Sequence, residues 1–463
     1  MMIKDRYAGC HSTRFPAAIS HFEDAVFAVA AHTNGAGDAL SEALLIDPAL
    51  IAALALKGLG ALILARAELQ DVARHNLQLA SAALAQNPEP TPGEVALVKA
   101  LSLACDGQFL VAASALEAHL NTAPHDLLAL KIAQALRFMG GDLPGLLRCT
   151  TQVLPDWNDD HVGVGFVYGC HAFGLEEAGQ YADAERFGRR AVLIEPRDAW
   201  GLHAVSHVHE TQGRVDAGVA WLEATRSSWS RCNNFAFHIA WHLSLFYLEA
   251  GDYEKALDLY DREVRPASTD DFRDISNASS LLWRLMQHGC DVEHRWDELT
   301  NLARHRAADH SLVFASLFHL MSALAGGAKD VAQQILTTLE WSAQQASGDQ
   351  SQAARRVGVP LARIMMGLAD ATHAVQPFAA SKGAQFDFVR LAQALPCLGG
   401  SNAQRDVFVR SLASFAADRG DRQTFERVMD IRRRTRAQDR FALEVTTRLH
   451  QVEAASHAKL RVA

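Results

Sequence analysis

Three histidines and a glutamate lie within eight positions of the segment LHAVSHVHETQGR, residues 202–214. His207 follows His203 by four residues, and Glu210 follows His207 by three. On a helix such steps nearly close whole turns, so these three side chains form one stripe. His209 points away from the stripe, and we expect it to pack against a neighbouring helix. Imidazoles beside a carboxylate can transfer protons near neutral pH or bind a metal ion.

A second helix places more groups of this kind near the stripe. The segment FHIAWHLSLFYLEAGDY, from Phe237, carries His238, Trp241 and His242 close together. Neighbouring helices pack about 8–10 Å apart, so long side chains at similar heights can touch. We therefore expect the two helices to bring four histidines, Glu210 and Trp241 onto one patch.

Three interpretations of this patch stay open. The side chains are satisfied polar groups of a packed interface, or they bind a metal, or they bind and transform a small molecule without one. Against a metal, the sequence has no HExxH motif. In the metal-free interpretation Glu210 orients an imidazole, and Trp241 provides an apolar or stacking wall. The candidate catalytic residues are His203, His207, Glu210, His238 and His242, and the same five are the candidate ligands of a divalent metal; no cofactor is otherwise predicted.

Two positions in the second half of the chain are candidate ligand-binding residues. Arg284 interrupts the apolar helix SSLLWRLMQHG, and we expect it to face a cavity or to pair with Asp270, Asp271 or Asp274. His310, which follows Asp309, is expected to face inward.

The segment LGGSNAQRDVF, residues 398–408, predicts a helix start. Ser401 and Gln404 have the spacing of a capping box. Asn402, Arg405 and Asp406 are left unexplained by the cap. A glycine-flanked helix N-terminus with an arginine in its first turn is also typical of anion binding, so these three are candidate ligand-binding residues.

Internal repetition indicates the elements that position these side chains. Segments such as GQYADAERFGRRAVLIEP, from Gly179, have the spacing of a 34-residue tetratricopeptide unit, in which a glycine opens the turn between two helices. Gly107, Gly213 and Gly251 occupy the same place, and strand signals are nearly absent. The sequence predicts an all-α, right-handed α-solenoid of helical hairpins, closed by additional C-terminal helices. We divide it into N-terminal hairpins (1–95), repeats that carry the histidines (96–265) and a C-terminal helical region (266–463).

Composition narrows the choice of partners. The 463 residues carry a net charge of −9, which gives no reason to expect nucleic acid or an anionic membrane. A basic run, Arg432 to Arg434 and Arg436, is interspersed with acidic residues, and we interpret it as a solvated helix face. The seven cysteines are scattered, which favours a reducing, cytoplasmic location. The oligomeric state is not predicted.

The segments PRDAWGLHAVSHVHE (from Pro196), FHIAWHLSLFYLEAGDYEKALDLYD (from Phe237) and LGGSNAQRDVF carry a resemblance. With them the chain resembles the tetratricopeptide repeat protein 38 family over nearly its whole length. The resemblance implies an intracellular all-helical protein with no settled activity. It also implies that His203, His207, His209, Glu210, His238, Trp241 and His242 match the family's histidine-rich motif. Phe237 and Ala240 depart from the more polar residues of relatives.

The leading prediction is a pocket lined by His, Glu and Trp that binds a small polar molecule and transforms it by acid–base chemistry. In that prediction Arg284 or Arg405 holds an anionic part of the ligand. The alternatives are a scaffold that binds a peptide or protein partner, and a metal-dependent enzyme. The sequence names neither a substrate nor a reaction.

Overall fold

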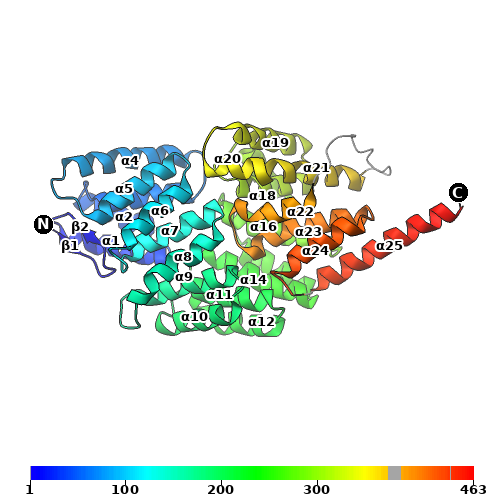
Figure 1. Cartoon of the computed structure of the whole chain (residues 1–463), viewed down its shortest axis with the longest axis horizontal. Helices are drawn as coiled ribbons and strands as arrows, with labels where there is room; N and C mark the ends of the chain where they lie inside the picture. Colours follow the sequence, from blue (N-terminus) through cyan, green and yellow to red (C-terminus); the bar gives the residue numbers. More distant parts are fainter. Residues whose placement is uncertain (1, 374–386, 438, 463) are drawn as a thin grey trace. The chain divides into compact units, whose positions relative to one another are not determined.

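The computed structural model describes the backbone of residues 2–373, 387–437 and 439–462, and the side chains of these except 368–373 and 456–462. The described chain is helical apart from one short antiparallel pair, β1 (Ile3–Lys4) with β2 (Cys10–His11). The predicted all-α class is thereby confirmed, and Figure 1 shows the helices in chain order. No helix in the described part of the chain is both long and apolar enough to cross a membrane.

The helices of the first half of the chain are α1 (Pro16–Ala31), α2 (Ala36–Ile46), α3 (Ile51–Ile63), α4 (Leu69–Gln86), α5 (Pro92–Cys105), α6 (Phe109–Leu120), α7 (Leu127–Gly140), α8 (Leu143–Val153), α9 (Val164–Glu177), α10 (Tyr181–Ile194), α11 (Ala199–Thr211) and α12 (Val215–Ala224). Those of the second half are α13 (Arg226–Trp229), α14 (Phe235–Ala250), α15 (Tyr253–Leu259), α16 (Phe272–Gln287), α17 (Arg295–Arg306), α18 (Val313–Ala325), α19 (Lys329–Gln344), α20 (Asp349–Ala353), α21 (Val359–His373), α22 (Phe388–Ala394), α23 (Asn402–Asp418), α24 (Arg422–Arg433) and α25 (Arg440–Val462).

Two compact units make up the chain. The first contains Met1–Val208, Leu222–Ile239 and Ala346–Gln350, and the second contains His209–Trp221, Ala240–Gln345 and Ser351–Ala463. The solenoid arrangement and the division into three regions stay predictions.

Left-handed glycines separate paired helices, as the repeat spacing predicts. Gly107, Gly179, Gly213 and Gly251 all have φ between 69° and 82°, and each follows the first helix of a pair. This backbone conformation costs a glycine little because it has no Cβ. Gly327 and Gly420 repeat the geometry between α18 and α19 and between α23 and α24, where the sequence shows no clear repeat signature.

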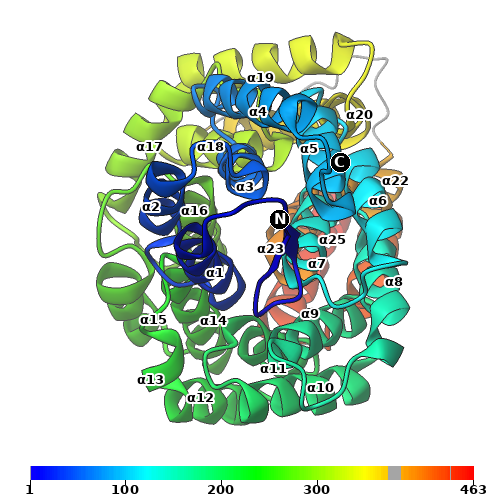
Figure 2. The same cartoon turned by 90° about the vertical axis from the view of Figure 1, so that its left-hand side faces the viewer.

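The first unit contains an unusually close approach of α9 and α11. A Cβ placed on Gly169 of α9 would lie 2.1 Å from Asp198 Oδ2 and 2.9 Å from the backbone nitrogen of Gly201. Around this contact, Leu146, Ala172, Phe173 and Ala204 form a buried cluster that joins α8, α9 and α11. Figure 2 shows α8, α9, α10 and α11 following one another in this unit. The glycines therefore set the distance at which side chains of α9 and α11 meet.

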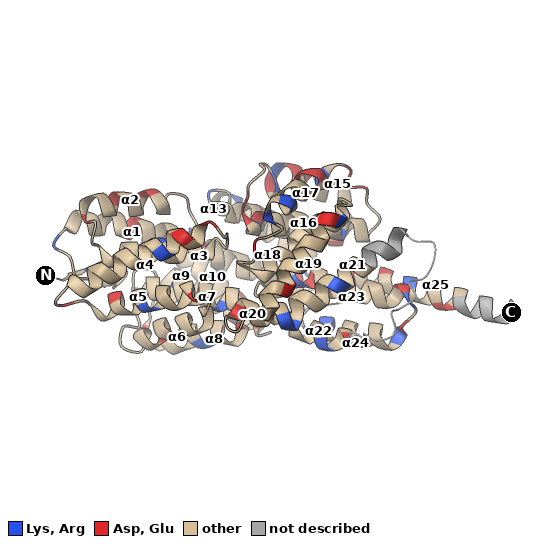
Figure 3. Ribbon diagram, turned by 90° about the horizontal axis from the view of Figure 1, so that it is seen from above, with Lys and Arg blue, Asp and Glu red and all other residues tan. Residues whose placement is uncertain are grey.

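The second unit is built on apolar helices such as α18. Every residue from Val313 to Ala323 is buried. Figure 3 draws this helix without acidic or basic colour, whereas α17 carries both signs. An all-round apolar helix is stable in water only inside a core.

We expect Gly169→Ala to destabilise the protein by about 1–3 kcal/mol, because the added methyl group overpacks the contact between α9 and α11. Gly60→Ala is the matched control: Gly60 lies inside helix α3, and a Cβ there meets nothing within 4 Å. The control should be neutral or stabilising by up to about 1 kcal/mol. Urea unfolding of both variants measures the difference, and equal stabilities would contradict the close approach.

Candidate functional site

Three imidazoles converge in the interior of the first unit. Nε2 of His203 lies 2.8 Å from Nε2 of His207 and 2.9 Å from Nε2 of His238. The three side chains, which we call the histidine triad, come from α11 and α14 and are 2%, 1% and 8% exposed. Their candidate ligand atoms all lie within 4.8 Å of one another. The predicted stripe of His203 and His207 and its meeting with His238 are therefore confirmed.

Glu176, at the end of α9, sits behind the triad. Its Oε2 lies 3.3 Å from Nδ1 of His207, and both side chains are 1% exposed. Glu176, Glu177 and His207 also form a group whose candidate ligand atoms lie within 4.8 Å of one another. The two groups lie within ion-pair distance, where the carboxylate favours a proton on Nδ1 of His207 and leaves Nε2 for the other two imidazoles.

Asp198 fixes the start of α11 and thereby the placement of His203 and His207. Its Oδ2 accepts the backbone N–H of Gly201 at 3.0 Å, which is the geometry of an N-terminal cap. The side chain is completely buried. Burial raises the pKa of this carboxyl to about 7, and the nearby Lys131 ammonium opposes the shift.

The Asp198 carboxyl makes stability depend on pH. Its pKa is higher in the folded chain than in the unfolded one, so its contribution is complete below about pH 4 and is lost as the pH rises through about 7. Asn keeps the cap and cannot ionise. We therefore expect Asp198→Asn to gain stability relative to wild type between pH 5 and 8. Urea unfolding at pH 5 and pH 8 measures the free energy of unfolding of both proteins. A difference between variant and wild type that is the same at both pH values would contradict the prediction.

An aromatic layer covers one side of the triad. The rings of Phe173 and Trp200 lie 5.7 and 5.2 Å from the ring of His203. Phe235 stacks on Trp200 at 5.4 Å and on His238 at 5.5 Å. Trp200 and Phe235 are half-buried, so this layer extends from the triad to the surface.

Glu210 and His242 belong to the second unit, where they pair with each other. Nδ1 of His242 lies 2.8 Å from Glu210 Oε2, and Arg436 binds the other carboxylate oxygen at 2.5 Å. Trp241 is completely buried, with its ring 5.5 Å from the Arg284 guanidinium. The prediction that these side chains join the triad in one site stays a prediction.

A buried ion network continues from Glu210. Arg432 binds both oxygens of Asp406, at 2.6 and 3.0 Å, and both oxygens of Asp439, at 2.9 and 2.5 Å. Burial would raise the pKa of Asp406, but Arg432 and Arg436 hold it below its usual range. The predicted solvated basic face is wrong for Arg432, which is 3% exposed, because Asp406 of α23 and Asp439 enclose its guanidinium.

Three candidate ligand-binding residues differ from expectation. Arg284 is buried and donates to the backbone oxygens of Ser280 and Ala403, at 3.2 and 2.8 Å. The predicted pairing with Asp270, Asp271 or Asp274 is wrong, since these bond elsewhere: Asp270 to Arg306, Asp271 to Arg273 and Asp274 to Thr269. His310 is exposed rather than turned inward, with its ring against Trp341 at 4.8 Å. Asp406, predicted to bind a ligand, forms an ion pair with Arg432 instead.

The predicted capping box at α23 is confirmed. Gln404 N donates to Ser401 Oγ at 3.2 Å, and Ser401 N donates to Gln404 Oε1 at 3.0 Å. Arg405 donates to Asn402 Oδ1 at 2.8 Å and to the backbone oxygen of Gly399 at 3.1 Å. Arg405 therefore holds the turn at the start of its own helix. This structural role, and not anion binding, accounts for Asn402 and Arg405.

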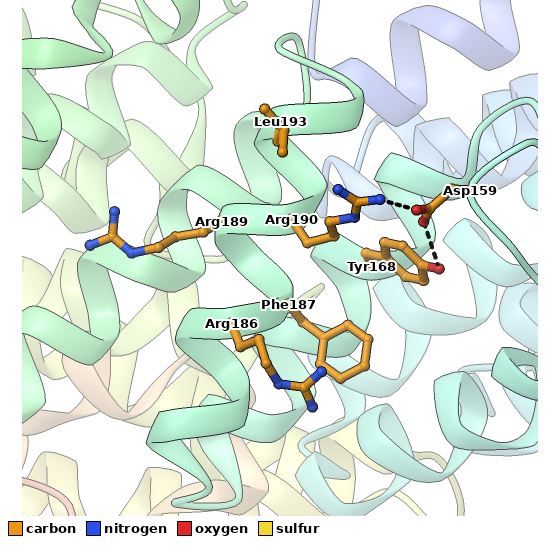
Figure 4. Close-up of a pocket in the computed structure, with 7 residues that line it drawn as sticks. All are labelled: Asp159, Tyr168, Arg186, Phe187, Arg189, Arg190 and Leu193. Atoms are coloured by element: carbon orange, nitrogen blue, oxygen red, sulfur yellow. Dashed lines mark hydrogen bonds and ion pairs between the residues drawn. The ribbon is translucent and has the colours of Figure 1, made fainter.

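Two hollows in the described structure have linings that include none of the triad residues. A surface hollow of about 430 Å³ in the first unit is lined by Asp159, Tyr168, Arg186, Phe187, Arg189, Arg190 and Leu193. Figure 4 shows Arg190 and Tyr168 both bound to Asp159, with Arg189 turned away from them. A second hollow, of about 50 Å³, lies in the second unit beside Glu210, Glu249, Arg436 and Asp439.

Sequence reasoning missed Glu176, as it missed Asp198 and the aromatic layer. A usable signal existed: Glu176 precedes the turn glycine Gly179 by three residues, as Glu210 precedes Gly213. The two glutamates therefore hold equivalent positions of successive repeats. Applying the repeat spacing to α9 as well as to α11 would have found it.

Compared with models of known protein families, the sequence matches none. The resemblance described above stays a prediction. What the site does must therefore be argued from its geometry.

We expect Arg432→Met to destabilise the protein by about 3–5 kcal/mol, because Asp406 and Asp439 stay buried without their shared cation. The control is Arg433→Met, which removes an exposed arginine paired with exposed Asp430 and should cost no more than about 1 kcal/mol. Thermal unfolding of both variants at one pH measures how much stability each has lost relative to wild type. Similar losses in both variants would show that the Arg432 network carries no special weight.

Proposed function

We propose that this protein binds a divalent transition-metal ion through Nε2 of His203, His207 and His238. The observation that carries the proposal is the convergence of these three nitrogens inside the first unit. Imidazole is a preferred ligand of Zn²⁺, Cu²⁺, Ni²⁺ and iron.

Hydrogen bonding alone explains the triad poorly. Each Nε2 has one in-plane position, which holds either a proton or a lone pair. Nε2 of His203 contacts two other Nε2 atoms, so it cannot donate to one and accept from the other. A cation at the centre would use all three lone pairs at once.

The spacing and the surroundings also support a metal. With metal–nitrogen bonds of about 2.0–2.1 Å, tetrahedral ligand nitrogens lie about 3.3 Å apart, so the contacts of His203 with His207 and His238 need to lengthen by only about half an ångström. Glu176 at Nδ1 of His207 supplies the carboxylate that commonly orients a metal-bound histidine. Three protein ligands leave a coordination position for water or a small molecule, as in catalytic zinc sites.

Metal-free acid–base chemistry is the second candidate. The pair of Glu176 and His207 supports it, since a buried carboxylate that orients an imidazole is the usual arrangement of a general base. His203 would then relay the proton. Binding of a peptide partner stays a prediction that no feature of the triad favours.

Metal content separates the two candidates. Wild-type protein purified without chelator should contain close to one equivalent of a transition metal in the triad, whereas His207→Ala should lose most of it because one of three ligands is gone. Inductively coupled plasma mass spectrometry measures the metal content per protein chain directly. His75→Ala, which removes an exposed histidine of the same unit, is the control and should keep the metal.

Glu176→Gln tests the orienting role. It keeps the shape of the side chain but removes its charge, and the metal affinity should fall about 10–100-fold. The absence of metal in wild-type protein, together with no rise in melting temperature on adding Zn²⁺, Fe²⁺, Ni²⁺ or Mn²⁺, would contradict the metal centre.

A further inference from the structure

Lys131 of α7 is a buried cation without a matched anion. Its side chain is 8% exposed. Its ammonium donates to Cys170 Sγ at 3.7 Å, and in the described part of the chain no carboxylate oxygen lies within 4.0 Å of it. A thiol is a weak acceptor, and burial raises the pKa of Cys170, so it carries no charge to offset the ammonium. Most of the hydrogen-bonding capacity of Lys131 is therefore unused.

A buried charge of this kind is costly unless a partner satisfies it. Asp198 is close enough to interact with Lys131 electrostatically but does not touch it. Its Oδ1 also lacks a hydrogen bond in the described structure. The Lys131 ammonium and the Asp198 carboxyl therefore lie near each other without forming an ion pair.

The Trp200 ring lies near both the Lys131 ammonium and the histidine triad. Lys131 Nζ lies 5.6 Å from the centre of the indole ring, and the same ring lies 5.2 Å from the ring of His203. Phe138, 6.2 Å from Trp200, is half-buried, as are Trp200 and Phe235. The aromatic layer thus provides an apolar surface that begins at the exterior and borders both the ammonium and the triad.

We propose that Lys131 binds the carboxylate of a small ligand whose apolar part lies against Trp200. The ligand class is a small organic monoanion with a flat or apolar body. As a ligand of the metal centre, this molecule rests on the proposed function, because only a metal at the triad would give it a second anchor. The Lys131 contact itself depends on no metal.

Three probes that share a ring and differ in charge test the proposal: benzoate, benzyl alcohol and benzylamine. Isothermal titration of the full-length wild-type protein should detect benzoate and should detect benzylamine at least tenfold more weakly. This comparison needs no variant, so it remains decisive even if substitutions at Lys131 impair folding. Equal binding of benzoate and benzylamine, or no binding of benzoate and acetate, would overturn the proposal.

Two variants locate the contact. Lys131→Met keeps the length of the side chain without its charge and should weaken benzoate at least tenfold. Lys99→Met removes an exposed lysine of the same unit and should leave the affinity unchanged. Trp200→Leu should weaken benzoate more than acetate, because it removes the ring surface and keeps the ammonium. Equal affinities in wild type and a folded Lys131→Met protein would also overturn the proposal.

The same titrations in metal-loaded and chelator-treated protein keep the two proposals apart. Metal binding without any effect of carboxylates overturns the Lys131 subsite and leaves the metal centre standing. Benzoate binding that depends on Lys131 in a protein that takes up no metal overturns the metal centre and supports the subsite.

Discussion

The close approach of α9 and α11 is the constraint on which the histidine triad depends. Gly169 and Gly201 leave no room for a Cβ between the two helices, and the Asp198 carboxylate fills the remaining space. The same contact starts α11 at a fixed residue, and the helical repeat then determines where His203 and His207 point. Because Glu176 lies in the last turn of α9, this distance also decides whether its carboxylate reaches His207. The packing of the two helix backbones therefore determines whether the side chains of the site can meet.

The buried charges of Arg432 and of Lys131 are matched differently. In the second unit Arg432 and Arg436 meet Asp406, Asp439 and Glu210 directly, so each charge is offset by a contact. Such pairs contribute little net stability, but losing one member is expensive. In the first unit the Lys131 ammonium has no carboxylate oxygen within 4.0 Å among the described residues. Incomplete matching is typical of places that receive a ligand, since the ligand supplies the missing partner.

Repeat spacing predicted the local features well. The turn glycines, the shared face of His203 and His207, and the capping box of Ser401 and Gln404 all follow from patterns of a few residues. Partners far apart in sequence were not predictable in this way. The burial of Arg432 depends on Asp406, 26 residues before it. The burial of Lys131 and Glu176 was not predictable either, because periodicity gives the face of a helix and not what covers it.

Burial of the triad has a kinetic consequence. Side chains that are 1–8% exposed cannot release a bound ion to solvent without a local opening of α11 or α14. Under the proposed function, exchange with free metal would then proceed at the rate of that opening, whatever the relative affinities of competing ions. The identity of the ion would be decided while the chain folds, by which metal is available at that moment. A protein produced in different growth media would accordingly keep the metal with which it folded until such an opening allows exchange.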